Sequence, residues 1–163
     1  MSFLNTTSTL HHVSQLPPGT TKAQALAMLS DREFFLTCAP SLSRFSAVQN
    51  PTPPPDVPEA IRAQARDDLK TDTFSVTDIV HAMPAGLWDT NVVSTYEITD
   101  ITDGVFVRIK SPMSISMDTM WEVKESEEGQ GRLELVEHIE IRCSRLLMGL
   151  VKGECEMGWA KIQ

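Results

Sequence analysis

Cysteine is scarce in this sequence, and the few cysteines are poorly spaced for a bridge or a metal site. Only Cys38, Cys143 and Cys155 occur among 163 residues, an odd number separated by long intervals. No CxxC pair and no ladder of cysteine and histidine is present. We therefore expect neither a disulfide framework nor a bound metal.

The signature loops of cofactor-dependent and nucleophilic enzymes are also missing. The chain has no GxGxxG, no P-loop, no HExxH and no GxSxG. These motifs build dinucleotide, phosphate, zinc and serine-nucleophile sites, so their absence removes the usual sequence support for those chemistries. We expect any reaction to use no cofactor and to depend on pocket shape together with one or two acids or a histidine.

Positive charge and long hydrophobic runs are both in short supply. The chain has 14 Lys and Arg against 22 Asp and Glu, a net charge of −8. Such a surface repels phosphate backbones and anionic membranes, so nucleic acid is not an expected partner. No apolar run is long enough for a membrane span, and the N-terminus lacks the features of a secretory signal. We expect no stable membrane insertion and a reducing, cytoplasmic location.

The length fits one domain over residues 1–163, with hydrophobic residues at an ordinary 41%. One low-complexity stretch, the proline-rich segment 50–55, cannot join a sheet. Pro58 suits the first turn of a polar helix over 59–69. Residues 50–70 are therefore predicted to be a surface insertion within the single domain.

The remaining pattern predicts an α+β fold. A strand over 9–16 precedes helices that begin at Thr20 or Thr21 and at Asp31. Further strands are predicted at 43–49, 71–83, 91–100, 105–112, 114–126 and 132–143, and a helix over 145–163. Turn residues at 102–104 and 128–131 make this an antiparallel meander. The absence of βαβ alternation excludes a parallel, Rossmann-type sheet.

Five stretches carry a family resemblance. They are Leu16-Pro17-Pro18-Gly19 and the segments 83–88, 103–105, 121–123 and 143–152. With this element order, the chain resembles a fungal branch of the START-like or helix-grip (SRPBCC) superfamily of lipid carriers and polyketide cyclases. The resemblance implies a curved seven-stranded antiparallel sheet around a long C-terminal helix, with two short helices after the first strand and an apolar cavity for a hydrophobic small molecule.

Two acids interrupt apolar rows. Asp78 shares strand parity with Phe74 and Val76, and Glu137 shares it with Leu135 and Ile139. If these rows line the cavity, desolvation would raise both carboxyl pKa values and suit the acids to general acid or base catalysis. Alternatively, a bulge or strand edge turns each acid to solvent, or each pairs with an arginine.

His12 and Tyr96 complete the candidate catalytic group. His11 and His12 place one imidazole on each strand face, and His12 has the parity of the apolar positions. It is a candidate proton shuttle or, alternatively, a satisfied core histidine. Tyr96 could donate its hydroxyl to a carbonyl in the pocket. His81 and His138 are predicted to face outward.

The candidate ligand contacts come from strands, a loop and the last helix. They are Phe74, Val76, Trp88, Met117, Thr119, Trp121, Leu135, Ile139, Leu150 and Gly153. Aromatic and methionine side chains at strand spacing are usually plain core, which is the first interpretation of these positions. Trp88 is predicted to lie at the pocket mouth. The glycines at 149, 153 and 158 are expected to make room for ligand or to let the helix lie close to the sheet.

Two functions remain open on the sequence. One is a cofactor-independent cyclase, isomerase or dehydratase acting on a bulky hydrophobic intermediate in fungal secondary-metabolite biosynthesis. The other is a non-catalytic carrier of a lipid, a sterol or another hydrophobic molecule. The inward or outward position of Asp78 and Glu137 would discriminate them. Both a monomer and a homodimer are compatible with the sequence.

Overall fold

The computed structural model describes residues 4–66, 69–81, 89–129 and 131–162. Its elements are β1 (Asn5–Gln15), α1 (Lys22–Ser30), α2 (Arg32–Thr37), β2 (Leu42–Ala47), α3 (Glu59–Arg62), β3 (Thr71–His81), β4 (Asp89–Ile101), β5 (Gly104–Ser111), β6 (Ile115–Glu125), β7 (Leu133–Ser144) and α4 (Arg145–Ile162). The predicted α+β class and the two short helices after the first strand are confirmed.

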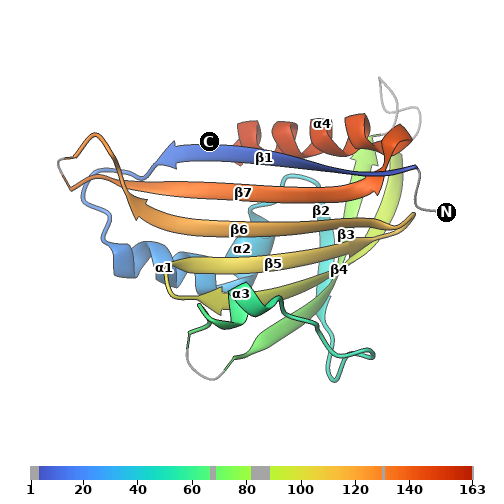
Figure 1. Cartoon of the computed structure of the whole chain (residues 1–163), viewed down its shortest axis with the longest axis horizontal. Coiled ribbons are helices and arrows are strands. Elements are labelled where there is room, and N and C mark those ends of the chain that lie inside the picture. The colour runs from blue at the N-terminus through green and yellow to red at the C-terminus, as the bar shows by residue number, and fades with distance from the viewer. Residues whose placement is uncertain (1–3, 67–68, 82–88, 130, 163) are drawn as a thin grey trace.

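All seven strands form one antiparallel sheet in the order β1-β7-β6-β5-β4-β3-β2. The segment from β3 to β7 is the predicted meander. The first strand pairs with the last, so β1 forms one edge of the sheet and β2 the other. Figure 1 shows the strands running across the molecule, with α4 along the β1 edge.

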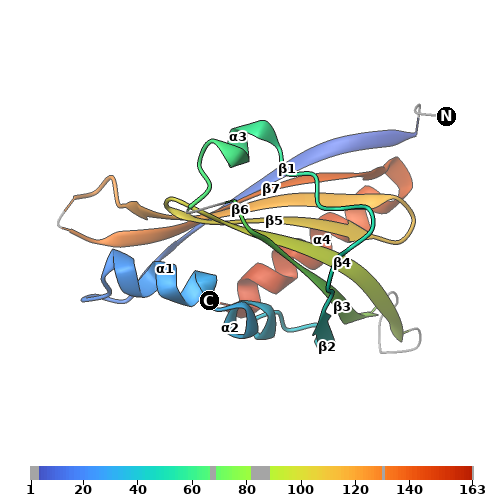
Figure 2. The same ribbon diagram turned by 90° about the horizontal axis from the view of Figure 1, so that it is seen from below.

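Helices lie on both faces of this curved sheet. Figure 2 shows α1, α2 and α4 beneath the concave face and α3 above the convex face. On the convex side, Val57 and Ile61 pack with Ile101, Phe106 and Met120. The proline-rich insertion therefore covers part of the sheet and contributes buried side chains of its own.

The concave face holds two separate apolar clusters. One lies under α1 and α2 and includes Leu29, Leu36, Val76 and Ile98. The other lies under α4 and is centred on Ile141. The concave face is therefore covered from two sides, by helices that come from opposite ends of the chain.

Local chemistry explains where the first two helices begin. Thr21 accepts a hydrogen bond from the Gln24 backbone, and the Gln24 side chain accepts one from the Thr21 backbone, which forms a capping box. Asp31 accepts from the backbone N–H of Phe34 and caps α2 in the same way. The chain thus turns sharply between α1 and α2.

Two predicted boundaries are wrong. The helix predicted over 59–69 ends at Arg62, because the following residues pair with the β4–β5 hairpin. Ala65 bridges Ile101, and the Thr102 backbone donates to Gln64. The first strand begins at Asn5 rather than at residue 9. Its inward positions there are threonine and serine, so no hydrophobic alternation marks them.

Candidate functional site

A largely buried polar contact on the concave face joins the first strand, β1, to the last strand, β7. In the register of β1 and β7, His12 lies directly opposite Glu137. Nδ1 of His12 is 2.9 Å from Oε1 of Glu137. The Glu137 side chain is 7% exposed and the His12 side chain 16%. This is an acid–imidazole pair held by sheet register and largely shielded from water.

Aromatic rings surround this pair. Trp121 of β6 is the register neighbour of Glu137 on the side away from His12. Trp159, near the end of α4, stacks on His12 at 4.8 Å between ring centres and 12° between planes. The same indole lies 5.6 Å from Trp121. Glu137 therefore sits in a row between His12 and Trp121, with Trp159 against both rings.

The aromatic row continues to the other helical layer. Phe35 of α2 meets Trp121 edge-to-face, with ring centres 6.0 Å apart. Trp121 is thus the side chain at which the α2 and α4 sides of the concave face meet. Offset and edge-to-face ring pairs of this kind add roughly 0.5–1.5 kcal/mol each beyond the area they bury. We expect this row to be one of the more rigid parts of the concave face.

Burial dominates the electrostatics of Glu137. Desolvation raises the pKa of its carboxyl above 4.5, although the hydrogen bond and charge of His12 oppose that shift. Burial has the larger effect because an ionised carboxylate loses much of its hydration here. The proton of this pair is therefore held between two groups that are both poorly solvated.

Tyr96 and Asp78 form a second polar region on the same face. Burial raises the pKa of Asp78, against a 3.1 Å hydrogen bond from the Ser41 hydroxyl. Burial, followed by the charges of Asp78 and Cys155, raises the pKa of Tyr96 far above its usual 10.0. Tyr96 is therefore a protonated phenol that can donate a hydrogen bond, and burial makes ionisation of Asp78 less favourable than it is in water.

Cys155 of α4 links the two regions. Its thiol is 3.7 Å from the sulfur of Met117. Burial, together with the charges of Glu137, Glu154 and Glu156, raises the pKa of Cys155 to about 12. A thiol with such a pKa is a poor nucleophile near neutral pH. Cys155 is therefore a packing residue that faces the site, not an activated nucleophile.

Sequence comparison places the chain in a family. A family model described as "Domain of unknown function (DUF7053)" matches residues 5–163. The chain belongs to the DUF7053 family. A search of the curated proteins finds no match. The family model spans both strands of the His12–Glu137 pair and the helix that carries Trp159, so the whole site lies within the DUF7053 domain.

The DUF7053 domain brings together some of the predicted catalytic residues and separates others. His12 and Glu137 touch, and Tyr96 lies near Asp78. No hydrogen bond or ion pair among the described residues joins Asp78 to Glu137. Both acids lie on the concave face, and neither of them pairs with an arginine that the structure describes.

The predicted ligand contacts divide by position. Phe74, Val76, Thr119 and Ile139 are buried, whereas Met117, Trp121 and Leu135 are half-buried on the concave face. The prediction that Leu150 and Gly153 face the concave side is wrong. The face of α4 that meets the sheet consists of residues 147, 148, 151, 155 and 159. Trp88 lies outside the described residues. His11 and His138 are exposed, the outward position expected for His138.

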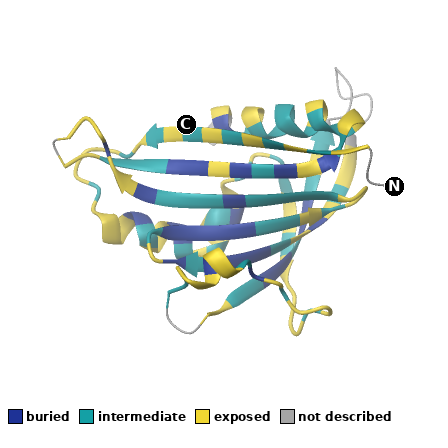
Figure 3. Ribbon diagram, in the orientation of Figure 1, coloured by how far each residue is buried: buried dark blue, intermediate teal, exposed yellow. Residues whose placement is uncertain are grey.

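The glycines of α4 do not let this helix pack closely on its own sheet. A Cβ added at Gly149, Gly153 or Gly158 would meet no described atom within 4 Å. The alternative in which these glycines let α4 lie close to the sheet is therefore wrong. Figure 3 shows exposed positions recurring along α4.

The described part of the chain also has an open groove that does not include the His12–Glu137 pair. This groove of about 320 Å³ runs along the ends of β2 and β3, lined by residues 47–51 and 70–74. Its lining is more polar than apolar, so it differs from the apolar cavity expected from the sequence. That cavity stays a prediction.

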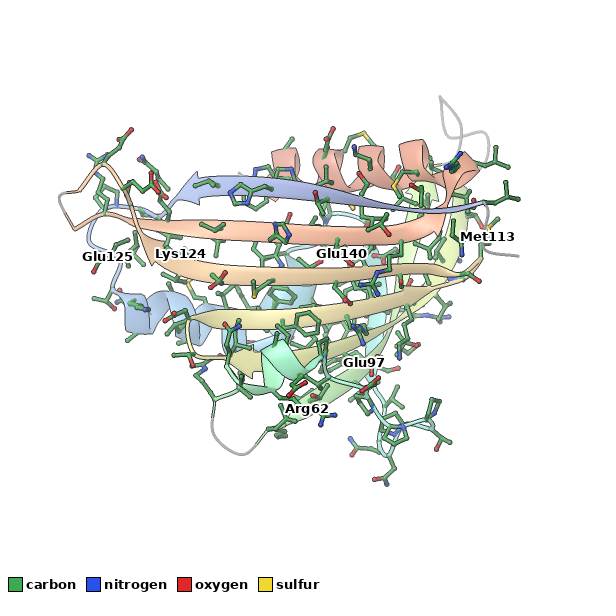
Figure 4. All side chains as sticks on the ribbon, in the orientation of Figure 1. Arg62, Glu97, Met113, Lys124, Glu125 and Glu140 are labelled. Carbon is green, nitrogen blue, oxygen red and sulfur yellow. The ribbon has the colours of Figure 1, made fainter. Side chains whose placement is uncertain are left out.

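The convex face carries ion pairs that are structural. Lys110 lies 2.7 Å from Glu97, and Arg108 holds Asp118 through two hydrogen bonds. Figure 4 shows the labelled Glu97 and Glu140 on this side.

Within the described ranges, no three His, Cys, Asp or Glu residues are placed to hold a metal ion. No described helix is both long and apolar enough to cross a membrane.

The most informative residue missed by sequence analysis is Trp159. Its spacing could have indicated it, because Leu147, Val151, Cys155 and Trp159 recur every four residues and so share one helix face. Ser41 had no comparable signal, since it lies in the turn before β2. Its contact with Asp78 depends on the pairing of β2 with β3.

Proposed function

We propose that this DUF7053 domain is a cofactor-independent enzyme that moves a proton on a bulky hydrophobic molecule bound to the concave face. The reaction would be of the cyclase, isomerase or dehydratase type, in a helix-grip domain related to START-like proteins. From the resemblance, we place it in fungal secondary-metabolite biosynthesis. The observation that carries the proposal is the 2.9 Å contact between His12 and Glu137 beneath Trp159.

The pair supplies a base. A carboxylate partner selects the tautomer in which Nδ1–H of His12 donates to Glu137, and this leaves a lone pair on Nε2. That nitrogen can take a proton from carbon next to a carbonyl and return it to another position. Glu137 stabilises the imidazolium formed in between. A positioned base of this kind typically contributes ~10²–10⁴-fold in rate.

Tyr96 and Asp78 would supply the hydrogen-bond donor that acts together with this base. The raised pKa of Tyr96 favours its protonated phenol, which can donate a hydrogen bond to a carbonyl oxygen, and burial shifts the pKa of Asp78 in the same direction. Such a donor stabilises the negative charge that develops on oxygen when the proton leaves carbon. The substrate would lie between this donor and His12, with Cys155 beside it.

The half-buried apolar row beside the site supports binding of a hydrophobic molecule. Tyr96, Ile109 and Met117 are register neighbours on β4, β5 and β6, and each is half-buried on the concave face. A flexible methionine side chain adapts to the shape of a ligand. Part of the concave face is thus available for apolar contact.

A non-catalytic carrier is the second candidate. The observation in its favour is that most concave-face positions are apolar and that Asp78 already has a partner in Ser41. A carrier would bind hydrophobic molecules equally well without His12 or Glu137. Removal of the His12–Glu137 pair should therefore abolish the reaction of an enzyme but leave the binding activity of a carrier unchanged.

The test separates binding from proton transfer. Hydrophobic ketones such as 2-tetralone are incubated with the protein in D₂O, and deuterium uptake next to the carbonyl is followed by NMR. Binding is measured in parallel by quenching of tryptophan fluorescence. We expect protein-dependent uptake that falls ~10²-fold in Glu137→Gln and His12→Gln, with ketone affinity nearly unchanged.

The same comparison includes Asp78→Asn, for which a similar fall is expected if Asp78 is the donor. His138→Gln is the matched control, because His138 is an exposed histidine on the opposite face of the sheet. Saturable ketone binding without uptake in any form would favour the carrier. Uptake that is unchanged in both Glu137→Gln and His12→Gln would contradict the proposed base.

A further inference from the structure

The outward face of α4 is apolar although nothing described covers it. Residues 146, 149, 150, 153, 157 and 160 follow the i, i+3, i+4, i+7 spacing of a single helix face. Leu146 is 89% exposed, Leu150 45% and Met157 52%. The remaining three positions are glycine, glycine and alanine. We call this set the α4 stripe, and it contains no charged residue.

The α4 stripe is not explained by the fold of one chain. The opposite face of α4 already packs on the sheet through residues 147, 148, 151 and 155 and on the rings of His12 and Trp121 through Trp159. Outward positions of a surface helix are ordinarily polar, and clustered apolar side chains there mark an interaction site. Helix α4 thus has apolar residues on its outward face that take no part in packing within its own domain.

From these contacts we propose that the α4 stripe is a homodimer interface, in which two copies of the chain pack their α4 helices antiparallel. The partner is a second copy because the stripe is complementary to itself. When Leu150 of one chain lies over Gly153 of the other, two-fold symmetry also places Gly153 of the first under Leu150 of the second. The same register sets Leu146 opposite Met157.

The glycines supply the space that this packing needs. A Cβ at Gly149 or Gly153 would meet no described atom within 4 Å, so the surface above them is open. Glycine inside a helix costs about 1 kcal/mol relative to alanine. An incoming leucine side chain would fill the space and bring the two helix backbones close together.

Charge complementarity selects the antiparallel direction. Arg145 and Glu156 are exposed on the same flank of the α4 stripe, since eleven residues are close to three full helical turns. In the register above, Arg145 lies within about two residues, or ~3 Å along the axis, of Glu156 in the other chain. Symmetry forms this pair twice. A parallel arrangement would place this flank of the two helices on opposite sides of the interface, so the Arg145–Glu156 pair would not form.

The experiment measures oligomeric state by sedimentation velocity across a wide range of concentration. We expect native protein to shift with concentration from 18.1 kDa to twice that mass. Leu150→Glu should be a folded monomer by circular dichroism. Val93→Glu is the matched control, because Val93 is also exposed (52%) but lies on the convex face, and it should dimerise normally.

A charge-reversal cycle tests the direction and does not depend on the folding of Leu150→Glu. Arg145→Glu and Glu156→Arg should each weaken the dimer, by roughly tenfold for two exposed pairs turned from attraction to repulsion. The double variant should recover native affinity. A native protein that is monomeric at every concentration, a dimer that survives Leu150→Glu, or a double variant weaker than either single one would overturn the proposal.

Discussion

The indole of Trp159 lies nearly parallel to the imidazole of His12, with 4.8 Å between ring centres and 12° between the ring planes. These residues are 147 positions apart in the sequence, on the first strand and the last helix. The contact therefore completes the site only when both ends of the chain have docked on the concave face. Stability and the geometry of the proposed base are coupled at this one pair.

Truncating this stack should destabilise the protein measurably. Trp159→Ala removes a side chain that is 9% exposed, and we expect a loss of about 3 kcal/mol in the free energy of unfolding. A double-mutant cycle with His12→Ala should give a coupling of roughly 0.5–1.5 kcal/mol. Urea unfolding of the four proteins measures both values. Strict additivity would show that the stack itself contributes nothing.

Asp78 should make the folded protein less stable as pH rises, which is the reverse of the effect of a carboxyl group whose pKa is lowered by folding. Burial raises its pKa from 3.8, so the folded protein binds this proton more tightly than the unfolded chain does. The contribution of Asp78 is therefore favourable at low pH and is lost as pH rises from about 3.8 through the raised pKa. Asp78→Asn should flatten that part of the profile, measured by urea unfolding at several pH values.

The companion variant Ser41→Ala should strengthen the dependence of stability on pH, whereas Asp78→Asn should weaken it. It removes the hydrogen bond that lowers the pKa of Asp78, so the pKa should rise further and the loss of stability should extend to higher pH. If Asp78→Asn left the profile unchanged, the carboxyl would be solvated in the folded protein.

Gly104 should tolerate no side chain. A Cβ there would lie 1.7 Å from the carbonyl oxygen of Trp121, an atom of the neighbouring strand backbone that cannot move aside. We expect Gly104→Ala to cost about 3 kcal/mol or more in thermal or urea unfolding. Gly158→Ala is the control and should stabilise α4 by about 0.5–1 kcal/mol, since the space around it is open.

The three cysteines should differ sharply in reactivity. Cys38 is exposed, Cys143 is 1% exposed, and burial raises the pKa of Cys155 to about 12. A disulfide reagent at pH 8 should therefore label one thiol in the native protein and three after denaturation. Native Cys38→Ser should show almost none. Rapid labelling of a second native thiol would mean that α4 opens readily or that Cys155 is accessible.

Much of the fold could be predicted from local patterns. Alternating residues gave the strands of the meander, the turn residues at 102–104 gave the β4–β5 hairpin, and capping threonine and aspartate gave the starts of α1 and α2. The helix over 59–69 was predicted too long, because a bridge between Ala65 and Ile101 competes with helical hydrogen bonds. Local propensity carries no information about such a distant partner.

The candidate site could be predicted only in part. Strand parity alone placed His12, Glu137 and Asp78 on the concave face, because successive side chains of a strand point to opposite sides. Parity does not show which strands are neighbours. The contact between His12 and Glu137 required the first strand to pair with the last, and Leu150 and Gly153 were assigned inward because the side of α4 that meets the sheet was not known.

The sequence by itself determined the α+β class, the strand faces and the inward parity of the two acids, since these depend on residue spacing and on backbone geometry within each element. The tertiary structure decided which groups share a proton, which ring covers them and which face of α4 stays exposed. His12 and Glu137 are 125 positions apart, and only the β1–β7 register brings their side chains within 2.9 Å. The properties of the pair follow from that proximity and from burial under Trp159, and both arise only when the sheet and α4 come together.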